Sequence, residues 1–270
     1  MPVMRKSELA NGNGQLPQVA VIPEAKKMML SMLKKSEKGE SEKIVLYGTE
    51  GWGKTTWAAK APAPVFLSTE DGLKCVSVDV FPEPQTWENV LECVNILRNE
   101  THGFKSFVVD TADWTESLCQ EFVLKKTGKN SIEEVGGGWG KGYTMVFEEW
   151  KRLLLGIDHL RREKKMHVIF LAHCAVKPFN NPQGENYERW EMKMDRRIAA
   201  LLKEWSDNLL FGTYDIAVDA EKGHRGKGYG GERIIHTNHS AAYDAKNRSS
   251  LPDQLTTDPA QFWSLVQGGK

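Results

Sequence analysis

The stretch Ile44-Val45-Leu46-Tyr47-Gly48-Thr49-Glu50-Gly51-Trp52-Gly53-Lys54-Thr55-Thr56 decides the fold of this chain. An apolar, partly β-branched run leads into glycines at fixed offsets and then Gly-Lys-Thr, which is the spacing of a phosphate-binding loop between a strand and a helix. Glycine lets consecutive backbone N–H groups turn toward phosphate oxygens. We therefore expect residues 48–56 to bind the phosphates of ATP.

Two side chains of this loop are expected to take part in the chemistry. Lys54 neutralises the outer phosphates during hydrolysis, and the hydroxyl of Thr55 is a ligand for Mg²⁺. The alternative is a surface turn with a chance lysine, but the complete spacing between a strand and a helix favours the phosphate site. ATP and Mg²⁺ are thus the predicted ligands.

The composition fits one compact α/β domain without a global charge. The chain has 270 residues, 40% of them hydrophobic, and a formal net charge of zero, so a nucleic-acid site would have to be a local basic patch. Its four cysteines lack Cys-x-x-Cys spacing, which is typical of reduced thiols. No apolar stretch is long enough to span a bilayer, and we expect a cytoplasmic protein that does not act at a membrane.

Two parts are expected along the chain: a flexible N-terminal arm over residues 1–22, and an ATPase domain over residues 23–270. In the domain, apolar runs alternate with segments of helical periodicity. This alternation predicts parallel strands whose carboxyl ends gather the ligands. Besides the strand before the phosphate loop, the predicted strands are 63–68, 105–110, 166–173, 207–218 and 232–237, and the predicted helices are 25–35, 87–98, 143–165 and 258–266.

Acidic residues stand at the ends of two predicted strands. Asp110 ends the strand 105–110 and is expected to hold the magnesium shell, although an aspartate there can also cap a helix. Glu70 follows the strand 63–68 and is expected to activate the attacking water, although Glu-Asp-Gly is also ordinary turn sequence. Asp71 is the expected turn residue and the reserve candidate for the base.

A histidine ends a third predicted strand. His173 follows the apolar run 168–172, where a polar side chain can contact the γ-phosphate and signal its presence to the next loop. The alternative is a polar residue that is satisfied locally. Cys174 beside it has no partner at metal-ligand spacing, so a metal site is not supported there.

The order of these motifs resembles the core of RecA-like recombinases. A phosphate loop, a strand ending in Thr-Glu-x-Gly (69–72), a strand ending in Val-Val-Asp-Thr (108–111) and a strand ending in His173 follow one another over roughly residues 44–218. The resemblance implies an α/β fold with a RecA-like P-loop NTPase core, in which a mostly parallel sheet is flanked by helices. It also implies that Glu70 activates the attacking water and that Asp110 holds the magnesium shell. His173 departs from the glutamine sensor that recombinases carry.

Three further segments resemble phage-encoded nucleotide-binding proteins of the AAA-type ATPase group. Some of these are core-only RecA relatives that anneal single-stranded DNA. The resemblance implies single-stranded DNA as a partner, a single-strand binding protein as a further one, assembly into a homo-oligomeric ring or filament, and the host cytoplasm as the location. The segments are 136–143, 179–190 and 245–248.

Two loops match the DNA-binding loops of recombinases by position, and we expect both to project from the same end of the sheet. Residues 127–142 and 175–194 mix basic and aromatic side chains, which suits contacts with the phosphates and bases of a single strand. The alternatives are a plain flexible connection for the first and aromatic packing for the second. The candidate DNA contacts are Lys129, Trp139 and Lys141 in the first loop and Lys177 and Arg189 in the second.

Basic residues near the C-terminus are further candidates for the nucleotide site. Lys246 and Arg248 are expected to contact the nucleotide, reaching the γ-phosphate from a neighbouring subunit as finger residues do. The glycine-flanked cations of residues 222–227 are a less favoured choice. The alternative for both groups is solvated charge.

The predicted function is that of an ATP-binding and ATP-hydrolysing protein that acts on single-stranded DNA in recombination or strand annealing. One alternative is a phosphotransferase of the small-molecule kinase type. Another is an ATP-switched binding protein with little turnover. A kinase would need an arginine-rich lid after the long helix, and residues 180–190 offer only Arg189.

Overall fold

The computed structural model describes residues 31–33, 41–219 and 227–268. The chain divides into two compact units, Met1–Lys38 and Gly39–Lys270, and the fold below is that of the second unit. The arm predicted for residues 1–22 and most of the helix predicted for residues 25–35 lie outside the described residues. The boundary after residue 22 therefore stays a prediction.

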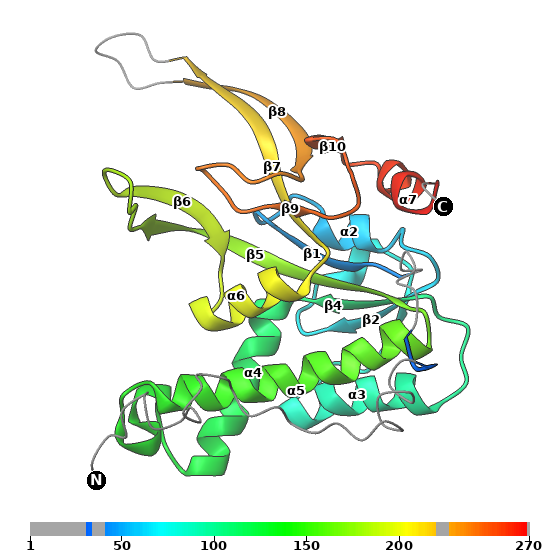
Figure 1. Ribbon diagram of the computed structural model, residues 1–270, viewed down its shortest axis with the longest axis vertical. Coiled ribbons are helices and arrows are strands. Elements are labelled where there is room, and N and C mark those ends of the chain that lie inside the picture. Colours follow the sequence, from blue (N-terminus) through cyan, green and yellow to red (C-terminus); the bar gives the residue numbers. More distant parts are fainter. Residues whose placement is uncertain (1–30, 34–40, 220–226, 269–270) are drawn as a thin grey trace, which may run out of the picture. The chain divides into compact units, whose positions relative to one another are not determined.

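The second unit is built on a mostly parallel sheet (Figure 1). Its central strand precedes the phosphate loop, and both neighbours of that strand run parallel to it. The strand that ends in Asp110 is not one of these neighbours, since one strand lies between them. In spatial order the parallel strands are β7 (Asn208–Asp219), β1 (Lys43–Gly48), β5 (His167–Phe179), β4 (Ser106–Asp110), β2 (Pro64–Ser68) and β3 (Asp79–Val80).

Antiparallel strands extend this sheet on the β7 side and along the second half of β5. β8 (Lys227–His236) pairs with β7, and β10 (Gln254–Thr256) pairs with β8. β9 (Lys246–Asn247) runs antiparallel to the start of β7. The second predicted DNA-binding loop is a correction: residues 175–194 are not an open loop, because β5 continues to Phe179 and pairs with β6 (Tyr187–Met192) as a hairpin.

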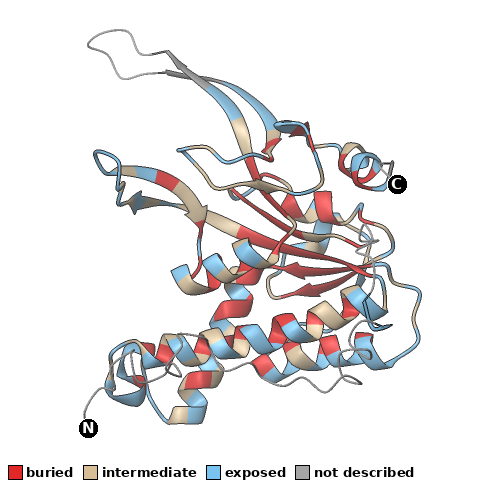
Figure 2. Cartoon of the chain, viewed as in Figure 1, coloured by how far each residue is buried: buried red, intermediate tan, exposed pale blue. Residues whose placement is uncertain are grey.

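Helices cover both faces of the sheet (Figures 1 and 2). Alternate residues of β1 point to opposite sides, with Val45 and Tyr47 in one core and Ile44 and Leu46 in the other. A central parallel strand is buried on both faces, which is why this run is continuously apolar. The first core is covered by α3 (Trp87–Asn99), α4 (Ala112–Thr127), α5 (Lys141–Glu163) and α6 (Arg196–Trp205), and the second by α2 (Lys54–Ala58) and α7 (Pro259–Gly268).

The predicted fold class is confirmed as α/β, with a mostly parallel sheet between helical layers. The predicted helices 87–98, 143–165 and 258–266 correspond to α3, α5 and α7 within a few residues. The helices α4 and α6 were not predicted. Two short 3₁₀ helices, η2 (Leu73–Cys75) and η3 (Ile132–Gly137), lie in connections. Among the described helices, none combines the length and the apolarity needed to cross a membrane.

Candidate nucleotide-binding site

The backbone of the phosphate loop requires glycine at three positions. Gly51 and Gly53 have φ angles of 69° and 101°, in the left-handed region that side chains rarely adopt. Gly48 has a different reason, because a Cβ atom there would lie 2.2 Å from the carbonyl oxygen of Gly212 on β7. The close approach of two strands and the turn of the loop thus account for the glycine spacing seen in the sequence.

Trp52 fixes this loop to β7 from behind. Its side chain is only 1% exposed and its Nε1 donates to the carbonyl oxygen of Thr213 at 2.8 Å. The hydroxyl of Tyr214 donates to the carbonyl oxygen of Gly51 at 3.2 Å. The indole of Trp52 therefore anchors the predicted phosphate loop to β7. Of the other predicted contacts in the loop, Glu50 and Thr56 are exposed.

Lys54 lies at the mouth of the loop, at the first residue of α2. The side chain is buried, and its Nζ donates to the carbonyl oxygens of Gly48 at 3.2 Å and Thr49 at 3.1 Å. Burial lowers the pKa of this ammonium, an effect opposed by the carboxylates of Asp110, Asp113 and Glu70 nearby. The ammonium of Lys54 is thereby held against the backbone of the phosphate loop.

Thr55 and Asp110 form the metal side of the site. The hydroxyl of Thr55 donates to Oδ2 of Asp110 at 2.7 Å, across the end of the intervening strand β5. Asp110 is fully buried, and its Oδ1 has no hydrogen-bond partner among the described residues. Burial raises the pKa of Asp110 to about 6. A buried carboxylate with an unused oxygen beside a hydroxyl is a donor set that fits Mg²⁺, which prefers oxygen ligands.

Glu70 is held at the edge of the same site. The preceding residue, Thr69, donates its N–H to the carbonyl oxygen of Asp110 at 2.7 Å, and Ser68 donates its hydroxyl to the carbonyl oxygen of Glu70 at 2.8 Å. These bonds fix the chain after β2 against the end of β4. Asp71 instead is exposed and pairs with Lys74 at 2.7 Å. The geometry therefore favours Glu70 over Asp71 as the base.

His173 connects Glu70 to an aspartate that the sequence reasoning missed as a site residue. Asp113 accepts two bonds from His173, one from its backbone N–H at 3.0 Å and one at Nδ1 at 2.8 Å. The other ring nitrogen, Nε2, lies 3.9 Å from Oε1 of Glu70. The bond to Asp113 raises the pKa of His173. For Asp113, burial favours the neutral form, but the bonds from His173 prevail and lower its pKa.

One signal could have identified Asp113. It lies three residues after Asp110, in the first turn of α4, which follows β4. The first turn of a helix that leaves the carboxyl end of a central strand faces the ligand edge of a parallel sheet. The N-cap of α4 is Thr111, and its side chain makes no capping bond.

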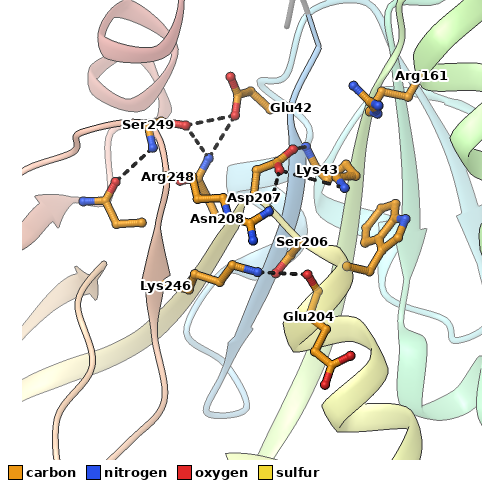
Figure 3. Close-up of polar contacts among 12 residues, drawn as sticks. Glu42, Lys43, Arg161, Glu204, Ser206, Asp207, Asn208, Lys246, Arg248 and Ser249 are labelled. Atoms are coloured by element: carbon orange, nitrogen blue, oxygen red, sulfur yellow. Dashed lines mark hydrogen bonds and ion pairs between the residues drawn. The ribbon is translucent and has the colours of Figure 1, made fainter. Parts of the chain in front are cut away.

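Lys246 and Arg248 lie far from the site of their own chain, and the predicted contact from a neighbouring subunit stays a prediction that their local partners disfavour. β9 pairs with the first residues of β7, so both lie at the amino end of the parallel strands. Lys246 donates to the carbonyl oxygen of Lys203 at 2.7 Å. It also donates to the carbonyl oxygen of Glu204 at 3.0 Å (Figure 3). Arg248 lies 3.5 Å from Asp207. Because β9 pairs with the first residues of β7, these cations lie at the edge opposite the phosphate loop. The less favoured candidates Lys222, His224 and Arg225 lie outside the described residues.

A family model described as an AAA domain matches residues 40–249. The chain belongs to this AAA-domain family. The matched range contains the phosphate loop, Glu70, Asp110 and His173, and it ends before β10 and α7. Membership therefore accounts for a P-loop nucleotide-binding domain.

Two further comparisons place this AAA-domain protein among known chains. It is 23% identical over 178 residues to the SPbeta prophage-derived uncharacterized protein YorG of Bacillus subtilis (strain 168), a match that covers 64% of this chain. The chain spans 50% of the length of that curated relative. A crystal structure of the RadB recombinase aligns with 86% of this chain and 95% of its own, with a TM-score of 0.39 and 13% identity.

The glycine-rich segment after α4 is the exposed region among the predicted DNA contacts of this AAA-domain protein. Trp139 is 97% exposed and has a φ of 60°. Lys129 and Lys141 are also exposed. The segment touches the start of α6, because Arg197 donates to the carbonyl oxygen of Gly140 at 3.2 Å. The connections after α4 and after β6 therefore meet.

The hairpin residues differ from this prediction. Arg189 is only 5% exposed, is ion-paired with Asp244, and lies over the ring of Phe179 at 5.0 Å. The expected DNA contact by Arg189 is thus corrected to a structural ion pair that ties β6 to the chain before β9. Lys177 donates to the carbonyl oxygen of Met194 at 2.9 Å, so its ammonium stabilises the hairpin base.

Proposed function

We propose that this chain is a Mg²⁺-dependent ATPase that acts on single-stranded DNA during recombination or strand annealing. The observation that carries the ATPase proposal is the convergence of side chains from four parallel strands, or from the residues that follow them, at one edge of the sheet. Lys54 and Thr55 follow β1, Glu70 follows β2, Asp110 ends β4, and His173 lies within β5 at the level of Gly48.

The proposed chemistry uses each of these groups at a stated atom. Glu70 accepts a proton from a water molecule whose oxygen attacks the γ-phosphorus, while the bond between that phosphorus and the β–γ bridging oxygen breaks. Lys54 stabilises the negative charge that develops on the phosphate oxygens. Thr55 and Asp110 would hold Mg²⁺, which supplies charge neutralisation at the β- and γ-phosphates.

His173 is proposed as the residue that detects the outer phosphate. Asp113 holds Nδ1 of the ring and directs Nε2 toward Glu70. Because Asp113 favours the imidazolium form, Nε2 can present a charged N–H to an anionic oxygen. β5 continues from His173 into the hairpin with β6. A shift in the position of the histidine can therefore be transmitted along β5 to that hairpin.

Single-stranded DNA is proposed as the partner on the strength of the glycine-rich segment. An exposed tryptophan between exposed lysines suits base stacking and phosphate contacts on a strand. The prophage origin of the relative from Bacillus subtilis supports a phage setting and, with it, the host cytoplasm. We include assembly into a homo-oligomer in the proposal, because annealing proteins act cooperatively along a strand.

The test of the proposed function is ATP hydrolysis measured with and without a single-stranded oligonucleotide. We expect Mg²⁺-dependent phosphate release that the oligonucleotide accelerates. If the wild type binds ATP but binds no oligonucleotide at low salt, the DNA proposal is wrong, and a phosphotransferase assay with small-molecule acceptors becomes the next experiment.

The DNA contacts can be separated by salt dependence. Replacing Lys129 and Lys141 with alanine should lower the log–log slope of binding against salt by about 0.7 for each lysine. Trp139→Ala should weaken binding by about 1–3 kcal/mol and leave that slope unchanged. The matched control is Lys246→Ala, whose ammonium is bonded to the end of α6. Equal slopes for the wild type and the double lysine variant would contradict the assignment.

A further inference from the structure

A hollow lies beside the phosphate loop, on the side away from the metal residues. Its volume is about 190 Å³, and its lining includes residues of the loop, of α2, of β8 and of the start of α7. Successive residues of a helix are rotated by about 100°, so Thr56 and Trp57 face away from Thr55, which contacts Asp110. The hollow therefore begins on the opposite side of the helix start. These lining residues are Gly53, Thr56, Trp57, Arg233, Thr257 and Pro259.

Arg233 presents a planar cation to this hollow. It belongs to β8, and a Cβ atom built on Gly53 would lie 3.1 Å from its Nη1. Its guanidinium lies over the ring of Tyr214 at 5.9 Å, and Tyr214 in turn hydrogen-bonds the phosphate loop at Gly51. Within the described part of the chain, the side chain of Arg233 makes no ion pair or hydrogen bond. A delocalised charge is thus placed against the loop with its donors available.

The opposite wall of the hollow is a turn that is fixed in place. Asp258 caps α7 by accepting the N–H of Ala260 at 3.0 Å. Behind this turn the helix packs on α2, where the rings of Trp57 and Phe262 meet edge to face with centroids 5.4 Å apart. Thr257 and Pro259 are therefore held beside the phosphate loop by the second core. Both lie beyond residue 249, where the family match ends.

The two ends of a bound triphosphate can be assigned from the side chains around the loop. Glu70 and His173 lie on the metal side, so the outer phosphate belongs there. The inner phosphate and the nucleoside of the bound ligand must then extend to the other side of the loop, toward Thr56 and Arg233. An arginine guanidinium is planar and stacks on aromatic faces, and a nucleobase offers such a face.

We infer that this hollow binds the nucleoside half of the nucleoside triphosphate, with the base stacked on the guanidinium of Arg233 and enclosed by Thr257 and Pro259. The inference rests on the proposed function of the adjoining loop. It assigns nucleoside recognition to β8 and to the turn before α7, two elements that carry none of the phosphate-binding or metal-binding residues.

The experiment compares ATP with inorganic tripolyphosphate, which has the phosphates and lacks the nucleoside. Both ligands are titrated by calorimetry with Mg²⁺ into the wild type and three variants. Arg233→Ala should weaken ATP binding by about tenfold and leave tripolyphosphate binding unchanged. Thr257→Phe, which fills the hollow, should act in the same direction. Arg248→Ala, an exposed arginine at the other edge of the sheet, should change neither affinity.

Tripolyphosphate binding also reports whether each variant retains a folded loop. Equal losses for both ligands in Arg233→Ala would make Arg233 a phosphate contact and overturn the inference. Unchanged ATP affinity in both hollow variants would overturn it as well. A wild type that binds tripolyphosphate as tightly as ATP would refute the nucleoside site alone, whereas a wild type that binds neither ligand would refute the proposed function itself.

Discussion

Polar residues gather at both ends of the same parallel strands, but with opposite consequences. At the amino edge, Asp207 lies between Lys43 and Arg248, with N–O distances of 3.9 and 3.5 Å (Figure 3). At the carboxyl edge, three carboxylates share the site with Lys54 and His173, and one carboxylate oxygen of Asp110 has no partner among the described residues. At the amino edge the charged side chains pair with one another, whereas the carboxyl edge has polar groups that are available to a ligand.

A charged cluster therefore indicates a ligand site only when its position in the fold and its partners are also known. Lys246 and Arg248 have the right chemistry for a phosphate, yet backbone carbonyls and Asp207 already engage them. Asp110 has the common chemistry of a capping residue, yet it is buried beside Thr55 with an unused oxygen. Two changes at the carboxyl edge, at Lys54 and Asp110, can therefore be compared with changes at the amino edge.

The largest effect is expected for Lys54→Ala. The loop would lose its buried cation, so ATP hydrolysis should fall by at least about 10²-fold, to the background of the assay, and ATP binding should weaken. Phosphate release and calorimetric titration measure the two effects. Lys246→Ala at the amino edge should retain wild-type hydrolysis. Hydrolysis by Lys54→Ala at the wild-type rate would remove the basis of the comparison.

Glu70→Gln should hydrolyse ATP about 10²–10⁴-fold more slowly while still binding it, because a positioned base is lost and the phosphate contacts remain. The neighbouring Asp71→Asn is the matched control, since Asp71 is exposed and pairs with Lys74. Single-turnover hydrolysis with bound ATP separates chemistry from binding. If Asp71→Asn hydrolysed ATP slowly and Glu70→Gln hydrolysed it at the normal rate, the base would be Asp71 and not Glu70.

The buried carboxylate of Asp110 should make stability depend on pH. Its folded pKa of about 6 lies above its ordinary value of 3.8, so the folded state binds the proton more tightly. Stability from this group is therefore present at low pH and is lost as pH rises through about 4 to 6, by up to about 3 kcal/mol. Without ligands, Asp110→Asn should remove this decline in urea unfolding.

The amino-edge counterpart is Asp207→Asn, which breaks ion pairs that are partly exposed. It should lower stability at neutral pH by about 0.2–1 kcal/mol. The two aspartate variants thus have opposite expected effects on the protein at pH 7. A decline between pH 4 and 6 that is the same in the wild type and in Asp110→Asn would show that Asp110 is not the group responsible.

The smallest effect is expected for Asp113→Asn, which keeps a hydrogen-bonding side chain but removes its charge. Because Asp113 raises the pKa of His173, the variant should lower that pKa. Any step that needs the imidazolium is lost as pH rises through this pKa, so the alkaline limb of the pH–rate profile should move to lower pH. Nuclear magnetic resonance titration of the histidine ring measures the pKa directly. If neither the alkaline limb of the pH–rate profile nor the pKa of His173 changed, Asp113 would have only a packing role.

The predicted site residues that the structure brings together follow a single geometric rule. Glu70 and Asp110 lie at or next to the carboxyl ends of β2 and β4, and His173 lies where the parallel pairing of β5 with β1 ends, so all three meet at one edge. The phosphate loop was predictable for the same reason, since its spacing encodes a strand, a turn and a helix. For these residues, local sequence and sheet topology suffice.

The residues whose surroundings differ from the expectation depend on contacts between distant segments. Arg189 became buried because β6 pairs back on β5 and brings it to Asp244, which is 55 positions away. Lys246 lies at the amino edge because β9 pairs antiparallel with the first residues of β7. Asp113 was missed because its partner, His173, is 60 positions away. No local pattern encodes these pairings.

The central claim is that the carboxyl edge is a Mg²⁺-dependent ATP-hydrolysing site. Phosphate release from ATP by the wild type, with a single-stranded oligonucleotide present and with either Mg²⁺ or EDTA, tests it most directly. We predict steady release in Mg²⁺ and only background release in EDTA. Background release in Mg²⁺ while the protein is saturated with ATP would contradict the claim.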